Sequence, residues 1–207
     1  MNNLNFSPLS SSTFNQILKR IGDFFISLFL IIALSPILVL VSVLVVSSSK
    51  GSAIYTQNRV GLNGKIFKMY KFRSMKIHDE IKYVQTVKND TRITAIGKLI
   101  RRTSIDELPQ LFNVLLGDMS LVGPRPVAIA LNSKYCSNIK NFNSRHKVKP
   151  GMSGLAQING YRGGDDNEHV KQRLSFDLEY ISKWSLLLDL KILVITPIEV
   201  IRNHKVF

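Results

Sequence analysis

Residues 24–49 form the longest apolar stretch of the chain, with no charged side chain across 26 consecutive positions. About 20 apolar residues are enough to cross the hydrocarbon core of a bilayer, so this length indicates a membrane segment. Ser35 and Pro36 lie at its centre, and a proline there removes a helical hydrogen bond and bends the helix. Each half then has about 12 residues, or roughly 18 Å of helix, which is about half a bilayer.

Basic residues flank this stretch on both sides: Lys19 and Arg20 before it, and Lys50, Arg59 and Lys65 after it. Because Lys and Arg favour the cytoplasmic side of a membrane, both flanks look cytoplasmic. A re-entrant hairpin over residues 17–49, broken at Ser35 and Pro36, fits this pattern better than a span. A spanning helix kinked at Pro36 is the alternative. The polar residues 1–16 are expected to form a flexible lead-in.

The remaining chain, residues 50–207, shows short periodic segments. Residues 53–75 alternate as two strands around Asn63 and Gly64, a dipeptide typical of hairpin turns. Further elements are expected in order: a helix over 91–102, a helix and basic connector over 127–149, and a glycine-rich structured loop over 149–166. This pattern predicts a small domain of the α/β class in an α+β arrangement, mostly helical with one short β-hairpin.

Residues 174–196 are apolar with charges at intervals, which makes this stretch too polar for a membrane span. Tyr180 and Trp184 would suit the boundary between membrane and water, so one interpretation is an interfacial amphipathic helix. The other interpretation is an ordinary helix that faces the core of the domain.

An adjacent acid pair, Asp106 and Glu107, precedes the apolar run QLFNVLLG. Pro109 lacks an amide hydrogen and so belongs among the first four positions of a helix. The helix is therefore expected to begin no earlier than about Asp106 and to end at Gly117. Ser104 and Glu107 also have the S-x-x-E spacing of a capping box. From this spacing alone, helix capping is the favoured role of the pair, and a reactive role depends on its neighbours.

The formal net charge of +14 is concentrated in part of the chain. Residues 50–102 carry 13 Lys and Arg against three acids, whereas residues from 151 onward carry seven of each sign. Such a local excess indicates an anionic partner: phosphate, acidic lipid or nucleic acid. Cys136 is the only cysteine, so an intrachain disulfide is excluded, and the four histidines lack the spacing of a zinc site.

Four motifs together resemble the bacterial sugar transferase family, the small monotopic phosphoglycosyl transferases. They are KFRSM (71–75), RRTSIDELPQLFNVLLGDMSLVGPRP (101–126), KPGMSGLAQINGYRG (149–163) and FDLEYISKWSLLLDLKILVIT (176–196). The apolar segment with its central Ser-Pro also fits, and the resemblance runs in order from about residue 17 to 205. The length resembles the minimal catalytic form of that family, without the extra N-terminal membrane domain of larger relatives.

The resemblance implies an enzyme that moves a sugar-1-phosphate from a UDP-sugar to undecaprenyl phosphate and releases UMP, at the start of bacterial surface-glycan assembly. It implies a catalytic domain on the cytoplasmic face of the bacterial inner membrane, with no nucleic-acid partner. Asp106 matches the family's nucleophile, which forms a covalent phosphosugar intermediate, and Glu107 completes the catalytic pair. The resemblance also implies a Mg²⁺ cofactor, held in part by Asp106.

Elementary chemistry agrees with these roles. A carboxylate can form an acyl-phosphate, but its diphosphate target is anionic and has to be neutralised by Mg²⁺ and arginines. The candidates for phosphate or headgroup contacts are Arg101 (or Arg102 in its place), Arg125, Lys71 and Arg73. The alternative function is a non-catalytic, membrane-tethered protein that binds acidic lipid or nucleic acid, and a third is a catalytically inactive scaffold of the same family.

Overall fold

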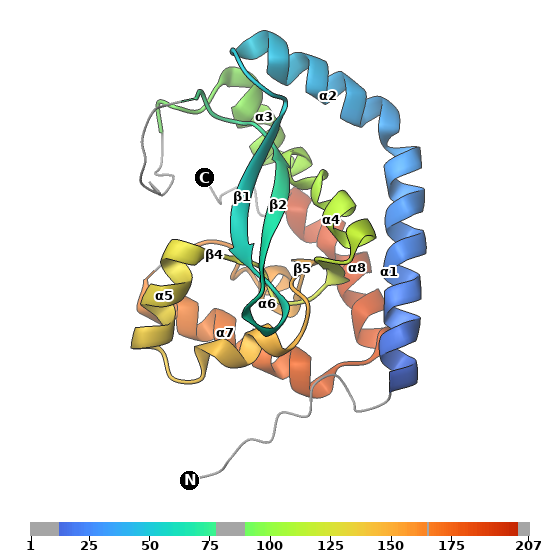
Figure 1. Ribbon diagram of the computed structural model, residues 1–207, viewed down its shortest axis with the longest axis vertical. Coiled ribbons are helices and arrows are strands. Elements are labelled where there is room, and N and C mark those ends of the chain that lie inside the picture. Colours follow the sequence, from blue (N-terminus) through green and yellow to red (C-terminus); the bar gives the residue numbers. More distant parts are fainter. Residues whose placement is uncertain (1–12, 78–89, 165, 203–207) are drawn as a thin grey trace.

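The computed structural model describes residues 13–77, 90–164 and 166–202. Within these ranges the chain is mostly helical with a small sheet, as the sequence predicts. The helices are α1 (Thr13–Ala33), α2 (Ser35–Ser48), α3 (Ala95–Arg102), α4 (Gln110–Leu116), α5 (Ile129–Asn138), α6 (Leu155–Ile158), α7 (Asn167–Lys183) and α8 (Leu186–Arg202). The strands are β1 (Ile54–Val60), β2 (Ile66–Phe72), β3 (Ser120–Val122), β4 (Val127–Ala128) and β5 (Gly151–Ser153). In Figure 1, α1 and α2 follow the outer edge of the molecule and the β1–β2 hairpin crosses its middle.

The long apolar segment is a bent pair of helices. α1 and α2 are separated by a break at Leu34, and their axes differ by 63°. Pro36 has no amide hydrogen to donate to the carbonyl of Ile32, its partner in a continuous helix. The Ser35 hydroxyl donates to that carbonyl instead, at 2.8 Å. The break predicted at Ser35 and Pro36 is confirmed, and Ser35 satisfies the acceptor that the proline leaves open.

No single helix in the described ranges is long and apolar enough to cross a membrane, whereas α1 and α2 taken together meet that requirement. The pair begins earlier than residue 17, because residues 13–16 already form the first turn of α1. The rest of the expected lead-in, residues 1–12, lies outside the described residues.

The predicted hairpin is confirmed. β1 and β2 pair antiparallel along their whole length, and β4 adds two residues to the other edge of β1. In the connecting turn Asn63 has a φ of 53° and Gly64 a φ of 80°. This is the left-handed backbone region that Asn and Gly tolerate best, so the dipeptide decides where the chain reverses.

A second pair of strands includes β5, which lies in the stretch 149–166 that the sequence predicts as a loop. β3 and β5 pair in parallel, with Ser120 opposite Gly151. The backbones approach so closely that a Cβ atom on Gly151 would lie 2.0 Å from the amide nitrogen of Gly123. A side chain is therefore excluded there, and β5 lies directly against the segment that leads to Arg125.

The C-terminal stretch 174–196 is not one helix, because the chain turns at Trp184 between α7 and α8. Tyr180 and Trp184 are 1 % and 4 % exposed and belong to the main hydrophobic cluster. Both donate hydrogen bonds to the Asp189 carboxylate, at 2.8 and 3.1 Å. The interpretation that these aromatic side chains lie at a membrane boundary is therefore wrong, since their polar atoms are satisfied inside the protein.

Polar contacts fasten α1 to the rest of the protein. Lys19 forms an ion pair with Asp189 of α8. Arg20 donates to two carbonyls at the C-terminal end of α4, at 2.6 and 2.8 Å, and Asp23 accepts a hydrogen bond of 3.1 Å from the backbone of β3. Helix α1 is thus attached to α8, to α4 and to β3.

Arg73 fastens the far end of α2. It is buried, and its terminal nitrogens donate to the carbonyls of Lys50 and Ser49 at 2.6 and 2.7 Å. These contacts satisfy carbonyls that a helix leaves open at its C-terminal end. The expectation that Arg73 contacts phosphate is corrected accordingly: its guanidinium is buried against the backbone at the end of α2 and, within the described residues, forms no ion pair with the acid pair.

Candidate active site

The acid pair lies in a short 3₁₀ turn, η2 (Ile105–Glu107), between α3 and α4. Ser104, just before it, has a φ of 58°, and its hydroxyl accepts a hydrogen bond of 2.8 Å from Arg162. Neither η2 nor α4, both fully described, has a side-chain cap. The capping box expected of Ser104 and Glu107 is therefore wrong. Asp106 does not cap a helix either, because α4 begins only at Gln110.

α4 is fixed against the β1–β2 hairpin by one side chain. Asn113 is fully buried, accepts a hydrogen bond of 2.9 Å from the amide of Tyr70, and donates one of 2.7 Å to the carbonyl of Lys68. It thereby pairs with the outer edge of β2 as a neighbouring strand would. α4 ends as predicted at Gly117, whose φ is 94°. These contacts place the acid pair beside Lys71 of β2.

Glu107 lies at the centre of three cations. Its carboxylate pairs with Lys71 Nζ at 2.8 Å, Arg125 Nη2 at 2.7 Å and Arg162 Nη2 at 2.9 Å. Arg125 Nη1 also donates to the second carboxylate oxygen, at 3.3 Å. Burial alone would raise the pKa of Glu107, but the three cations together hold that pKa well below its usual range. Glu107 is therefore ionised, and both of its oxygens are engaged.

The Gly-Pro-Arg-Pro turn is held from several sides. The Arg125 carbonyl accepts a hydrogen bond of 2.7 Å from the buried Arg145, and the Pro126 carbonyl accepts one of 3.1 Å from Arg59. The two residues before Arg125 bond to the backbone of β5 and its surroundings at 2.8 and 2.9 Å. A backbone fixed in this way presents the Arg125 guanidinium in one position, which suits bidentate contact with a carboxylate or phosphate.

Asp106 differs from its neighbour. It is 9 % exposed, and within the described residues its carboxylate forms no hydrogen bond or ion pair. Burial raises the pKa of Asp106 to about 6, although Lys71 and Arg101 oppose the shift. At neutral pH the side chain is therefore ionised and more basic than an ordinary aspartate, and it is available to a ligand.

Arg101 is the member of the arginine pair that acts on the acid pair. Its charge lowers the pKa of Asp106, whereas Arg102 is exposed at the end of α3. Of the predicted contact residues, the structure thus brings Arg101, Arg125 and Lys71 together around the acid pair. Arg73 does not join them.

Arg162 is a site residue that the sequence analysis did not single out. It follows α6, and its terminal nitrogens donate to Ser104 and Glu107 at 2.8 and 2.9 Å. It stands in the motif KPGMSGLAQINGYRG, which could have drawn attention to it. The spacing gives no reason to place it near Glu107, because the intervening chain contains α4, α5, α6 and the three short strands β3, β4 and β5.

The acid pair offers one carboxylate to a metal ion. Within the described ranges no group of three or more His, Cys, Asp and Glu side chains could hold a metal. Both oxygens of Glu107 are engaged, so Asp106 is the protein ligand that remains available. Mg²⁺ usually keeps several waters and binds one or two carboxylates together with substrate phosphates. The residues present therefore fit a Mg²⁺ ion whose coordination is completed by a phosphorylated substrate.

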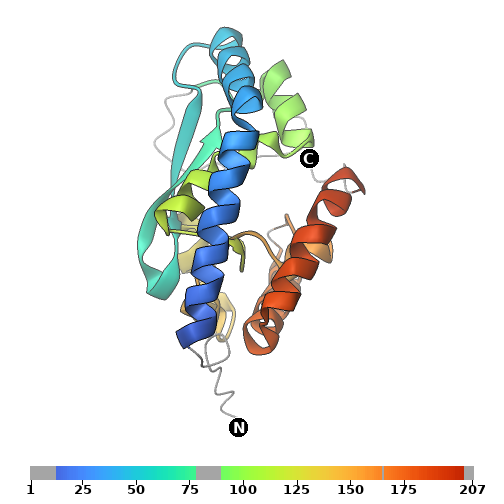
Figure 2. The same ribbon diagram turned by 90° about the vertical axis from the view of Figure 1, so that its right-hand side faces the viewer.

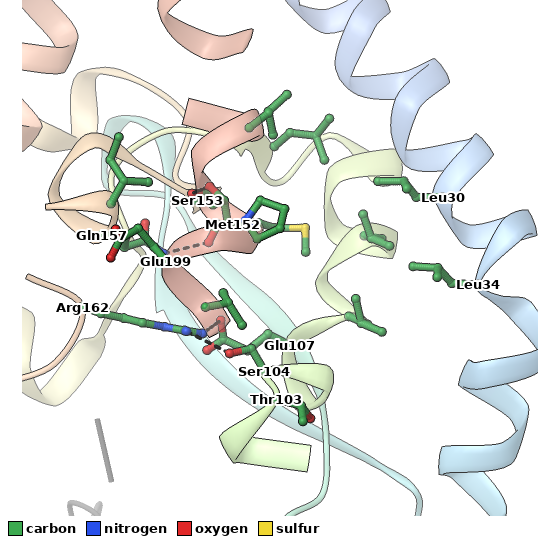
Figure 3. Close-up of a pocket in the computed structure, with 18 of the residues that line it drawn as sticks. Leu30, Leu34, Thr103, Ser104, Glu107, Met152, Ser153, Gln157, Arg162 and Glu199 are labelled. Atoms are coloured by element: carbon green, nitrogen blue, oxygen red, sulfur yellow. Dashed lines mark hydrogen bonds and ion pairs between the residues drawn. The ribbon is translucent and has the colours of Figure 1, made fainter. Parts of the chain in front are cut away.

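A cavity of about 590 Å³ opens beside the acid pair. Figure 3 shows Leu30 of α1 and Leu34 of the break on one side of it, Gln157 and Arg162 on the opposite side, and Glu107 near one end. Its other apolar walls come from the segment around α4 and from α8, and include Leu108, Leu111, Leu193, Pro197 and Val200. The charged residues of the lining are Glu107, Arg162 and Glu199 of α8, whereas Asp106, next to Glu107, does not line the cavity. Its apolar residues come mainly from the α1–α2 break, α4 and α8.

Comparison with known proteins places this arrangement in a family. The family model described as bacterial sugar transferase matches residues 14–203, which include the bent helix pair, the acid pair and the surrounding cations. The chain belongs to the bacterial sugar transferase family. The acid pair and the cations around it therefore lie inside the region that the family model matches.

Curated relatives extend the comparison. This bacterial sugar transferase is 49 % identical over 192 residues to the UDP-glucose:undecaprenyl-phosphate glucose-1-phosphate transferase of Klebsiella pneumoniae, covering 92 % of the chain and 41 % of the relative. It is 40 % identical over 205 residues to the undecaprenyl-phosphate galactose phosphotransferase of Salmonella typhimurium, covering 91 % and 41 %. The exopolysaccharide production protein PSS of Rhizobium leguminosarum bv. phaseoli is 43 % identical over 197 residues, with 92 % and 98 % covered. The chain thus spans about two fifths of the first relatives and nearly the whole of the last.

Proposed function

We propose that this bacterial sugar transferase moves a sugar-1-phosphate from a UDP-sugar to undecaprenyl phosphate, with release of UMP, during assembly of a bacterial surface glycan. The observation that carries the proposal is the acid pair itself. Asp106 is a buried, ionised carboxylate without a partner in the described chain, and it stands beside Glu107, which orients three cations. The relatives named for glucose-1-phosphate and galactose phosphate transfer to undecaprenyl phosphate support the reaction class.

In the first step, an Asp106 oxygen attacks the phosphorus that carries the sugar. A bond forms between that oxygen and the phosphorus, the bond to the bridging oxygen of the diphosphate breaks, and UMP leaves with the electron pair. The cations Lys71, Arg125 and Arg162 outnumber the carboxylates of Asp106 and Glu107, which favours binding of the anionic donor. Such fixed charge stabilises the negative charge that develops on UMP.

In the second step, an oxygen of undecaprenyl phosphate attacks the same phosphorus. The bond to Asp106 breaks, the carboxylate is regenerated, and the product is a lipid diphosphate that carries the sugar. A covalent intermediate divides one difficult transfer into two easier ones. It also allows UMP to leave before the lipid phosphate enters, so the two anionic substrates do not have to occupy the site together.

Magnesium is part of the proposal through Asp106. The free carboxylate would hold the ion together with the diphosphate of the donor, and the bound ion would neutralise charge on that diphosphate. Glu107, whose oxygens are engaged by cations, has the separate role of positioning Arg125, Lys71 and Arg162.

The reaction is tested by release of UMP. Purified protein with Mg²⁺, undecaprenyl phosphate and each of a panel of UDP-sugars is expected to release UMP with at least one donor. UDP-glucose and UDP-galactose are the first to try, because the named relatives act on glucose and galactose phosphates. If no donor in the panel gives UMP above the level without protein, the proposed reaction is wrong.

We further propose that α1 and α2 form a re-entrant hairpin in the cytoplasmic leaflet. Both ends of the pair are fastened to the same domain: α1 through Lys19, Arg20 and Asp23, and α2 through Arg73. Ends that are attached to one domain lie on one side of a membrane. The 63° bend at Pro36 supports the same arrangement.

Thiol labelling tests this topology. Cysteines introduced as Asn15→Cys and Tyr55→Cys, in a Cys136→Ser background, are expected to stay unlabelled by an impermeant reagent in intact spheroplasts and to react after permeabilisation. Labelling of only one of them in intact cells would show a span. Pro36→Leu serves as the comparison, because a helix without the proline regains the missing hydrogen bond and is expected to favour a straight span.

A further inference from the structure

The cavity beside the acid pair is built between two helices that are far apart in the sequence. Its lining combines Leu30 of α1 and Leu34 of the break with Leu193 and Val200 of α8. Figure 2 shows these helices as two long rods on the same side of the molecule, α1 in front and α8 beside it. Leu34 is the residue at which α1 and α2 part, so the cavity reaches the level of the bend.

The polar groups in the lining are largely engaged with one another. The Ser153 hydroxyl bonds to the Thr196 hydroxyl at 2.5 Å, and the Gln157 amide nitrogen donates to the Met152 carbonyl at 2.8 Å. One buried acceptor, Oε1 of Gln157, has no partner in the described structure. A nucleoside would need several free donors and acceptors, whereas a hydrocarbon chain needs only apolar walls. The lining therefore fits a hydrocarbon chain better than the uridine of the donor.

The two helices also present apolar side chains on their outer surfaces. On α8 the exposed large hydrophobic residues are Leu186, Leu187, Leu190, Val194, Ile198 and Ile201. α1 likewise exposes Phe25, Phe29 and Ile32. Exposed apolar side chains in this number suit contact with lipid. A chain that enters between α1 and α8 would therefore come from the membrane without passing through water.

The charged end of the cavity supplies the other half of the fit. Arg162 lines the cavity, and its Nη2 lies 2.9 Å from a carboxylate oxygen of Glu107. Glu107 directly follows Asp106 in the sequence. Lys71 and Arg125 approach Glu107 as well but do not line the cavity. The cavity therefore meets the ion-pair cluster of Glu107 at Arg162, whereas Asp106, Lys71 and Arg125 lie outside its lining.

We propose that this cavity binds the first isoprene units of a polyprenyl phosphate, with the phosphate at Arg162 and the chain between α1 and α8. The proposal rests on the proposed function, because it assigns a place to the lipid acceptor of that reaction. The basic side, with Lys71 and Arg125, then receives the nucleotide donor. Burial of the chain also orients the acceptor phosphate toward the phosphorus bound to Asp106.

A matched pair of substitutions on α8 tests the proposal by kinetics. Val200→Trp fills the cavity, whereas Val194→Trp makes the same change on the outer surface of the same helix, where Val194 is 62 % exposed. Val200→Trp is expected to raise KM for undecaprenyl phosphate about tenfold and to leave KM for the UDP-sugar within about twofold. Val194→Trp is expected to change neither. An equal rise in both KM values for Val200→Trp would assign the cavity to the donor, and no rise in either would also overturn the proposal.

Photolabelling of the unmodified protein gives a measurement that does not depend on folding of a variant. A polyprenyl phosphate with a diazirine on its first isoprene units is expected to label peptides from α1 near Leu30 and from α8 near Leu193. Excess undecaprenyl phosphate is expected to remove this labelling, whereas excess phosphatidylglycerol is not. Labelling elsewhere, or equal removal by phosphatidylglycerol, would overturn the proposal. If the wild-type protein released no UMP but was labelled as expected, the reaction would be wrong and the chain site right.

Discussion

Asp106→Asn is expected to abolish UMP release, with a loss of at least about a thousandfold, because an amide cannot form the acyl-phosphate that the carboxylate forms. The folded structure should tolerate the change, since the Asp106 side chain makes no hydrogen bond or ion pair in the described chain. The midpoint of thermal unfolding is therefore expected to stay within about 2 °C of the wild type. UMP release and thermal unfolding of the same preparation measure both quantities.

Asp118→Asn is the matched control, because it makes the same chemical change twelve residues later, outside the acid pair and the cations that contact it. It is expected to keep wild-type activity. A second readout is intact mass: wild-type protein incubated with the UDP-sugar and no lipid acceptor should gain the mass of a sugar phosphate, and Asp106→Asn should not. A variant that unfolds at the wild-type temperature and still turns over at the wild-type rate would remove Asp106 from the mechanism.

Glu107→Gln is expected to reduce both stability and activity, in contrast to the change at Asp106. The substitution keeps the shape of the side chain but removes the charge that compensates Lys71, Arg125 and Arg162. Removal of one partner from a buried ion pair typically costs about 3 kcal/mol or more. For a chain of this length that corresponds to a fall of about 10 °C in the unfolding midpoint. Activity is expected to fall as well, because the cations lose their common anchor.

The control for this prediction is Glu179→Gln. Glu179 pairs with Lys183 at 2.9 Å on α7, where the Lys183 side chain is 71 % exposed and that of Glu179 42 % exposed. Exposed pairs of this kind contribute little to stability, so the unfolding midpoint and the rate of UMP release should both stay unchanged. If Glu107→Gln were as stable as the control, the three cations would not depend on Glu107, and its positioning role would be wrong.

Several features follow from the sequence because they depend on the backbone chemistry of a few neighbouring residues. Pro36 cannot donate a hydrogen bond, so the apolar segment has to break there whatever surrounds it. Asn63 and Gly64 tolerate a left-handed backbone, and Gly117 does the same at the end of α4, which fixes the hairpin turn and the helix stop. The acid pair and its excess of nearby basic residues were also visible in the sequence, and so was the family resemblance.

The predictions that the structure overturns concern side chains whose partners are decided by tertiary packing. Ser104 and Glu107 have the spacing of a capping box, yet charge compensation from three distant cations draws Glu107 away from the helix end. Tyr180 and Trp184 suit a membrane boundary by type, but Asp189 satisfies their polar atoms inside the core.

By itself, the sequence determined where the chain bends, turns and stops, and which carboxylates stand together, because these properties are set within a few residues. Only the tertiary structure decided which of the 28 lysines and arginines surround Glu107, that Asp106 is left without a partner, and that α1 and α8 enclose an apolar cavity beside them. The physical reason is that a buried charge requires compensation but does not specify its source. Any nearby cation can supply it, and packing of distant segments determines which one is near.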